Sequence, residues 1–118
     1  YTTLFRSTSQ VKNMSWMFNG CNNIEKINFG NINTSSVEDM TTLFQNCNQL
    51  TSIDLSNFDT SQVTDMSWMF KGCTNLKYVN LSFFDASNTN TIYKLFSNCN
   101  SIIYINLYIY KLNNSANR

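Results

Sequence analysis

The sequence predicts an α/β solenoid, with a parallel β-sheet on one face and short helices on the other. Three observations predict this fold: a fixed repeat length, a helix-like pattern in the first half of each repeat and a strand-like pattern in the second half. The repeat length is set by the cysteines, which stand 26 residues apart at Cys21, Cys47, Cys73 and Cys99. A fixed period of about 20 to 50 residues is typical of chains in which each repeat stacks on the next.

The repeats organise the chain as a single repeat domain over residues 1–118. A partial repeat over residues 1–10 comes before four full repeats, which span residues 11–36, 37–62, 63–88 and 89–114. A free stack of repeats needs polar caps, whereas the last repeat ends on the apolar residues Ile105, Leu107, Ile109 and Tyr110. We therefore expect the chain to be a segment of a longer array, or a further coil to cover this end.

The first half of each repeat is predicted to form a short helix. In the third repeat, Val63, Met66, Phe70 and Cys73 fall at spacings of three or four residues, and Met69 shares their face, which is the apolar pattern of a helix packed on a core. Residues that favour a left-handed conformation come directly before the cysteines: Gly20, Asn46, Gly72 and Asn98. Because such residues commonly close helices, each helix is expected to end there.

The second half of each repeat is predicted to form a short strand. The segment Leu50-x-x-Ile53-x-Leu55 alternates inward apolar positions with outward polar ones, as a half-buried strand does. The same pattern surrounds Ile27, Val79 and Ile105. Stacked coils would place these strands side by side at about 4.8 Å, so that equivalent residues form columns.

Composition argues against several classes of function. The chain carries 8 basic and 7 acidic side chains, for a net charge of +1, without a run of Lys or Arg, so nucleic acid is not an expected partner. It has no histidine, which is the commonest general base and a frequent metal ligand. We therefore expect no enzymatic activity, no cofactor and no metal site. Because no apolar run is long enough to span a bilayer, we also expect no direct membrane insertion by this segment.

The cysteine column favours packing over chemistry. One cysteine per coil at an apolar position indicates a structural ladder of buried free thiols. Adjacent coils would also hold Cys21 with Cys47, and Cys73 with Cys99, at Cα separations of about 5 Å, which a disulfide tolerates. Ligands stacked in a line do not surround a zinc ion tetrahedrally, and a catalytic thiol would lack a histidine partner.

Outward positions of the predicted strands form polar columns flanked by tyrosines. The candidate ligand-binding residues on this sheet face are Lys26, Asn28, Asp54, Tyr78, Asn80, Tyr104, Asn106 and Tyr108. One interpretation is a strip that recognises a carbohydrate or peptide by stacking and hydrogen bonding. The other is that Asn and Asp keep the sheet soluble and bond to one another along the column. The sequence does not choose between them.

Two tryptophans share one position of the repeat. Trp16 and Trp68 stand where the other repeats have Thr42 and Lys94, so the column is expected to be exposed or half exposed. The indoles are either contact residues for a partner or lie flat over the neighbouring coil. Four asparagines also match the N-glycosylation acceptor pattern: Asn13, Asn33, Asn80 and Asn113.

The detailed repeat resembles a known family. The segments Met69-Phe70-Lys71-Gly72-Cys73-Thr74-Asn75-Leu76 and Leu50-Thr51-Ser52-Ile53-Asp54-Leu55-Ser56-Asn57-Phe58-Asp59-Thr60-Ser61 resemble the BspA-like leucine-rich-repeat surface proteins, whose repeats occur in bacterial lipoproteins and protist surface proteins. The resemblance extends from about Thr8 to Leu107. It implies a leucine-rich-repeat-like right-handed coil and a location that is extracellular or on the cell surface, without catalysis.

These observations together predict a binding module. The first expectation is a non-enzymatic leucine-rich-repeat module of a surface or secreted protein that mediates adhesion or macromolecular binding, with a host or extracellular protein or a glycan as partner. The alternative is a structural segment of a self-assembling fibre or matrix, in which solenoid ends associate and coils stack end to end as a filament.

Overall fold

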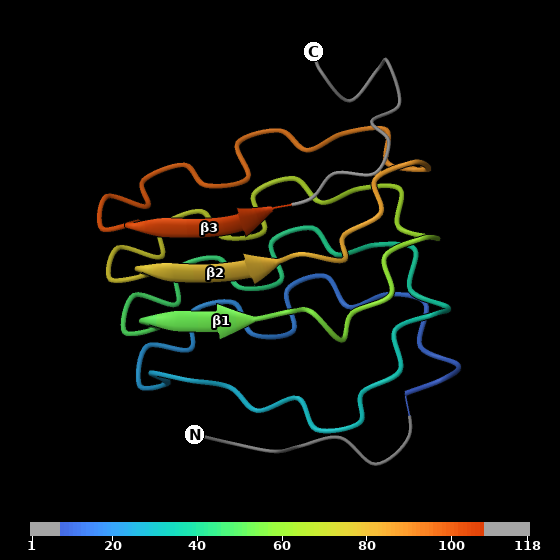
Figure 1. The fold of residues 1–118 in the computed structure, drawn as a ribbon, viewed down its shortest axis with the longest axis horizontal. Helices are drawn as coiled ribbons and strands as arrows, with labels where there is room; N and C mark the ends of the chain where they lie inside the picture. Colours follow the sequence, from blue (N-terminus) through green and yellow to red (C-terminus); the bar gives the residue numbers. More distant parts are fainter. Residues whose placement is uncertain (1–7, 108–118) are drawn as a thin grey trace.

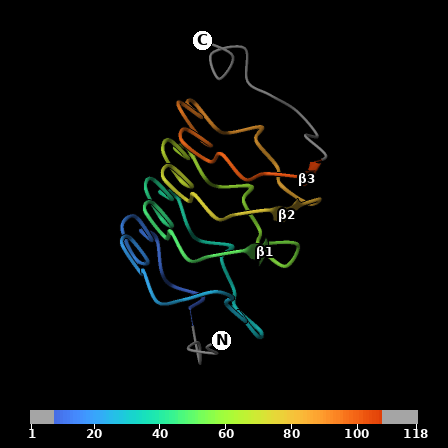
Figure 2. The ribbon, with the colours of Figure 1, turned by 90° about the vertical axis from the view of Figure 1, so that its left-hand side faces the viewer.

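The computed structural model describes residues 8–107 of the chain. Each 26-residue repeat makes one circuit around a shared core, and successive circuits lie on one another, as Figures 1 and 2 show. Backbone hydrogen bonds join the circuits at regular intervals. The amides of Met14 and Met40 donate to the carbonyls of Asp39 and Asp65, at 2.9 and 3.0 Å. Equivalent residues of neighbouring repeats therefore lie side by side.

Three short parallel strands form one sheet. They are β1 (Ser52–Asp54), β2 (Tyr78–Leu81) and β3 (Tyr104–Leu107), in the order β1-β2-β3. Their register is one to one: Ser52 pairs with Tyr78, which pairs with Tyr104. The strands expected around Ile53, Val79 and Ile105 are thus present. The segment around Ile27 is not a strand, although the Thr51 amide donates to the Glu25 carbonyl at 3.0 Å and joins it to β1.

The predicted α/β solenoid is wrong, because residues 8–107 contain no helix. The segment expected to be helical in the third repeat is a series of tight turns. Each turn is closed by a bond from an amide to the carbonyl three residues earlier: Met69 to Met66, Lys71 to Trp68 and Cys73 to Phe70. The intervening amides donate to the fourth repeat instead: Met66 to Thr91, Trp68 to Tyr93, Phe70 to Leu95 and Gly72 to Ser97. Amides bonded to a neighbouring circuit do not donate to the carbonyl four residues back, as a helix requires.

The apolar spacing suits these turns as well as it suits a helix. Met66, Met69, Phe70 and Cys73 are buried whereas Trp68 is exposed, so burial follows the expected pattern without helical geometry. An isolated helix shorter than about 12 residues has little stability of its own, and the neighbouring circuit offers a carbonyl to every second amide. The left-handed conformation expected before each cysteine is confirmed, with positive φ at Gly20, Asn46, Gly72 and Asn98. These residues close turns rather than helices.

The dimensions contradict the predicted filament segment. The described chain has principal extents of 34 × 33 × 21 Å and a radius of gyration of 13.1 Å. One circuit encloses a wide core, whereas stacked strands advance only about 4.8 Å per circuit. Four circuits therefore give a compact globule and not a rod.

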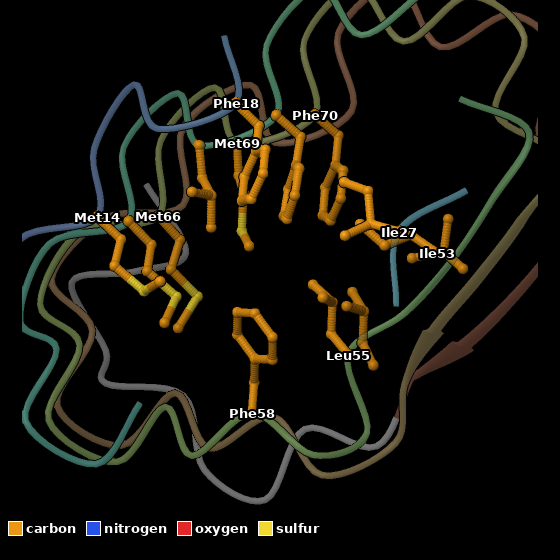
Figure 3. Packing of buried hydrophobic residues seen from close by; sticks show 14 of the residues in the cluster. Met14, Phe18, Ile27, Ile53, Leu55, Phe58, Met66, Met69 and Phe70 are labelled. Carbon is orange, nitrogen blue, oxygen red and sulfur yellow. The ribbon is translucent and has the colours of Figure 1, made fainter. Parts of the chain in front are cut away.

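The core lies inside the circuits, and its side chains form columns along the stack. Figure 3 shows Met14, Phe18, Ile53 and Phe58 pointing inward from different sides of the circuit. The longest aromatic column is a stack of four phenylalanines: Phe18, Phe44, Phe70 and Phe96. Their ring centroids are 5.5, 5.5 and 5.2 Å apart, and adjacent rings are parallel to within 10°. Each circuit thus offers a flat apolar surface to the next.

Buried threonines join the circuits at another corner. The Thr34 hydroxyl donates to the Asp59 carbonyl at 2.9 Å and accepts from the Asp59 amide at 2.8 Å. Thr60 bonds Asp85 in the same way, at 3.0 and 2.8 Å. Both threonines are 1% exposed. Each hydroxyl therefore satisfies two backbone groups of the next circuit at a position closed to water.

Gly72→Ala is expected to lower the free energy of unfolding more than Gly20→Ala does. Both glycines have positive φ, at +76° and +70°, so either alanine costs about 1 kcal/mol in backbone strain. A Cβ at Gly72 would also lie 2.3 Å from Asn46 Oδ1, whereas a Cβ at Gly20 meets nothing within 4 Å. We expect a total of about 1.5 kcal/mol for Gly72→Ala, measured by urea denaturation. Equal losses for the two variants would contradict the contact with Asn46.

Candidate binding surfaces

Asparagine and aspartate close local turns at three positions of the repeat. In each case the side-chain Oδ1 accepts a hydrogen bond from the amide two residues later, at 2.7 to 3.1 Å. The residues are Asn13, Asp39 and Asp65; Asn28, Asp54 and Asn80; and Asn33, Asp59 and Asp85. Such turns favour Asn, Asp, Ser and Thr, which explains why these residues recur along the chain.

These turns also explain the N-glycosylation pattern. At Asn13 and Asn33 the Oδ1 atom accepts both the amide and the hydroxyl of the serine two residues later, and at Asn80 it accepts that amide. The turn alone therefore accounts for an Asn-x-Ser sequence at these three positions. The fourth match, Asn113, lies outside the described residues.

The sheet face is hollowed by two adjoining depressions. The first, of about 270 Å³, lies over the strands, and its polar and aromatic lining is Ser52, Asp54, Tyr78, Asn80, Tyr104 and Asn106. The second, of about 300 Å³, shares Ser52 and Asp54 with it and adds Lys26, Asn28, Gly30 and Asn57. Every candidate sheet-face residue within the described chain thus lines one of the two. Tyr108, the last candidate, lies outside the described residues.

A tyrosine pair dominates the first depression. Tyr78 and Tyr104 are register partners on β2 and β3, with 51% and 58% of each side chain exposed. Asn80 and Asn106 are also partners, two residues further along the same strands. The Oδ1 atom of Asn80 accepts from the Ser82 amide at 3.1 Å, and backbone pairing of β2 with β3 keeps Asn80 beside Asn106. Aromatic surface and hydrogen-bonding groups therefore lie in parallel rows on one sheet.

The turns of the four repeats form a second surface, which we call the turn face: residues 14–23, 40–49, 66–75 and 92–101. Figure 2 shows these turns at the left, away from the strands. Trp16 is 61% exposed and Trp68 is 36% exposed, whereas Thr42 between them is 4% exposed. Trp68 meets Tyr93 edge to face, with ring centroids 5.7 Å apart. The expectation that the indoles lie over the neighbouring coil thus describes Trp68 in part. Trp16 is the more exposed of the two tryptophans.

The tryptophan position requires a left-handed backbone in every repeat. The φ angles are +65° at Trp16, +55° at Thr42, +56° at Trp68 and +52° at Lys94. Each is the third residue of a four-residue turn, where a type II turn needs positive φ and favours glycine or asparagine. A bulky side chain there costs about 1 to 2 kcal/mol. The strain at this column was not foreseen, because the segment was expected to be helical.

The sequence patterns missed three features of these surfaces. Asn57 lines one of the depressions, and Tyr93 covers one edge of Trp68. Tyr93 had a usable signal, since it replaces a Ser or Thr found at that position in the other repeats. An apolar cavity of about 260 Å³ was also missed; its lining is Met66, Leu81, Phe84, Ala86, Ile92, Leu95, Phe96 and Leu107.

The four cysteines are free thiols, and three of them donate hydrogen bonds to the backbone. The Sγ atoms of Cys47, Cys73 and Cys99 donate to the carbonyls of Phe18, Phe44 and Phe70 at 3.0, 3.0 and 2.9 Å. Burial raises the pKa of Cys47 to about 11. A hydrogen bond with Cys99, followed by burial, raises the pKa of Cys73, and the same bond lowers the pKa of Cys99. The two most buried thiols are therefore protonated at neutral pH, where a thiol is a poor nucleophile.

Comparison with known families gives one result. A family model described as a Mycoplasma protein of unknown function, DUF285, matches residues 6–116. The chain belongs to this family. The expected membership of the BspA-like leucine-rich-repeat family is therefore wrong. The strand spacing on which that expectation rested is not specific, because any short parallel strand beside a core can have it. Neither the curated proteins nor the solved structures include a match to this DUF285 chain.

Two properties of the described residues bear on chemistry and location. Residues 8–107 hold no group of three or more His, Cys, Asp or Glu side chains placed to bind a metal ion. The same part of the chain has no helix with the length and apolarity needed to cross a membrane. The sheet face and the turn face are therefore the surfaces from which a function is best argued.

Proposed function

We propose that this DUF285 protein is a non-enzymatic recognition module that binds a host or extracellular protein, or a glycan, through its sheet face. The observation that supports this function best is the exposed Tyr78–Tyr104 pair beside the row formed by Asp54, Asn80 and Asn106. Tyrosine gives a large contact area with little loss of side-chain freedom. Carboxylate and amide groups next to it supply directional hydrogen bonds.

The depressions are shallow and open onto a flat sheet, which suits an extended ligand better than a small substrate enclosed for reaction. The chain lacks histidine, and its buried thiols are held protonated by their surroundings, with the pKa of Cys47 at about 11. We also propose a location outside the cell or on its surface. Thiols buried as deeply as Cys47 and Cys73 can stay reduced in an oxidising compartment, since oxidation follows thiolate character and exposure.

The test compares the parent protein with a Tyr78→Ala/Tyr104→Ala double variant on arrays of glycans and of purified extracellular matrix proteins. We expect at least a tenfold weaker apparent affinity of the double variant for any ligand of the sheet face, because both stacking surfaces are removed. Both residues are about half exposed, so the variant should fold normally. Trp16→Asn, on the turn face, is the matched control and should keep sheet-face binding. Unchanged binding by the double variant would overturn the proposal.

A further inference from the structure

We propose that the turn face carries a second binding site, for a linear anionic polysaccharide in which a neutral sugar alternates with an acidic one. The polysaccharide would lie along the stacking direction of the circuits. Its neutral sugars would stack on Trp16 and Trp68, and an acidic sugar would meet Lys94. This site is separate from the sheet face, and it has its own residues and its own test.

The register of the backbone places the four residues in one column. The amides of Trp16, Thr42 and Trp68 donate to the circuit that follows each of them, at 3.2, 3.0 and 2.9 Å. With about 4.8 Å between neighbouring circuits, the two tryptophans stand about 10 Å apart. This separation is close to the length of a disaccharide in an extended β-linked chain. Successive sugars would therefore lie over Trp16, over the position of Thr42, which is itself buried, over Trp68 and over Lys94.

Neither the backbone nor the core explains tryptophan at this position. The backbone is left-handed in each circuit, a conformation that favours glycine or asparagine over a bulky side chain. Trp16 is 61% exposed, so its indole adds little to the core. Thr42 is small and buried between the two indoles, which makes the column alternate between aromatic and flat positions. An alternating ligand matches this alternation.

The charge and polarity of the turn face fit an acidic glycan. The residues of the turn face include no Asp or Glu in any repeat, whereas they include Lys71 and Lys94. The Lys94 Nζ atom lies 5.0 Å from the centroid of the Tyr93 ring, which holds the ammonium group next to Trp68. Gln45, whose backbone amide donates to the Thr42 carbonyl at 3.1 Å, supplies a side-chain amide of the kind that bonds to sugar hydroxyls.

The test is a titration of the intact chain with an octasaccharide of alternating N-acetylglucosamine and glucuronate, followed by tryptophan fluorescence and calorimetry. The comparison ligand is a neutral oligomer of N-acetylglucosamine of the same length. We expect saturable binding of the acidic octasaccharide, at least tenfold tighter than binding of the neutral oligomer, and weakening as salt is added. Trp16→Asn and Trp68→Asn should each weaken it at least tenfold, and Lys94→Asn should remove most of its salt dependence.

Asparagine suits a left-handed position, so Trp16→Asn should melt at or above the temperature of the parent chain. Trp68→Asn also loses the contact with Tyr93 and should stay folded with a lower melting temperature. Three results would overturn the proposal: no saturable binding at millimolar octasaccharide, binding unchanged in both tryptophan variants, or equal binding of the neutral oligomer. Loss of octasaccharide binding in Tyr78→Ala/Tyr104→Ala alone would place the glycan on the sheet face and overturn the turn-face site, while leaving the proposed function in place. Loss in the tryptophan variants alone supports the second site.

Discussion

Phe44→Ala is expected to lower the free energy of unfolding by about 4 kcal/mol, which is the usual range for removing a buried phenylalanine. Phe44 is 0% exposed. Its ring stacks between those of Phe18 and Phe70, with both centroids 5.5 Å away, and it meets the edge of Phe29 at 6.0 Å. Alanine would leave a cavity in the middle of the stack, where the two flanking circuits are held apart by their own backbone bonds and cannot close it.

The measurement is urea denaturation followed by tryptophan fluorescence. Phe83→Ala is the matched control, because Phe83 is 69% exposed and its truncation should change stability by no more than about 0.5 kcal/mol. A loss below about 1.5 kcal/mol for Phe44→Ala would contradict a close-packed aromatic column. A fall in the slope with urea would instead show that the stack unfolds in parts and not as one unit.

The period of the sequence predicts columns, and much of the architecture follows from columns alone. Because a one-to-one parallel register brings residues 26 positions apart together, Tyr78 and Tyr104 could be placed side by side without a structure, and they are register partners. The same reasoning placed left-handed residues at Gly20 and Asn46, where φ is positive. A backbone conformation can therefore be predicted from one sequence when the residue type that favours it recurs at the same position of each repeat.

The local backbone was harder to predict, because burial patterns do not state which hydrogen bonds a segment makes. Met66 and Met69 are buried in a helix and in the observed turns alike. The deciding interaction is the bond from the Met66 amide to the Thr91 carbonyl of the next circuit, at 3.1 Å. A single-repeat view does not contain that acceptor, so local periodicity favoured the helix.

The sequence predicted the exposure of the sheet face better than the exposure of the tryptophan column. Exposure of Tyr78 follows from strand alternation, which holds along β2, whereas β3 exposes Leu107 as well as Tyr104. Exposure in the tryptophan column varies from 61% at Trp16 to 4% at Thr42, because a small residue is covered by its large neighbours. The Oδ1 atoms of Asp54 and Asn80 accept hydrogen bonds that close local turns. This role depends on the backbone geometry, which residue spacing alone does not give.

Thr60→Val is expected to lower the free energy of unfolding by about 2 kcal/mol, although valine has nearly the same shape. The Thr60 hydroxyl donates to the Asp85 carbonyl at 3.0 Å and accepts from the Asp85 amide at 2.8 Å. Thr60 is 1% exposed, so water cannot readily replace the hydroxyl. The variant would leave two backbone groups without this partner in the interior, and such desolvated groups cost more than the net value of a hydrogen bond.

Two matched variants separate the hydroxyl from the packing in the same urea experiment. Thr60→Ser keeps the hydroxyl and removes one methyl group, so its cost should be about 1 kcal/mol or less. Thr64→Val removes an exposed hydroxyl, which donates to the Glu38 carbonyl at 3.1 Å, and should change stability by no more than about 0.5 kcal/mol. If Thr60→Ser is as damaging as Thr60→Val, the column acts through its shape and not through its hydrogen bonds. If instead only the valine variant is strongly destabilised, the circuits depend on side-chain hydroxyls as well as on apolar contact to stay in register.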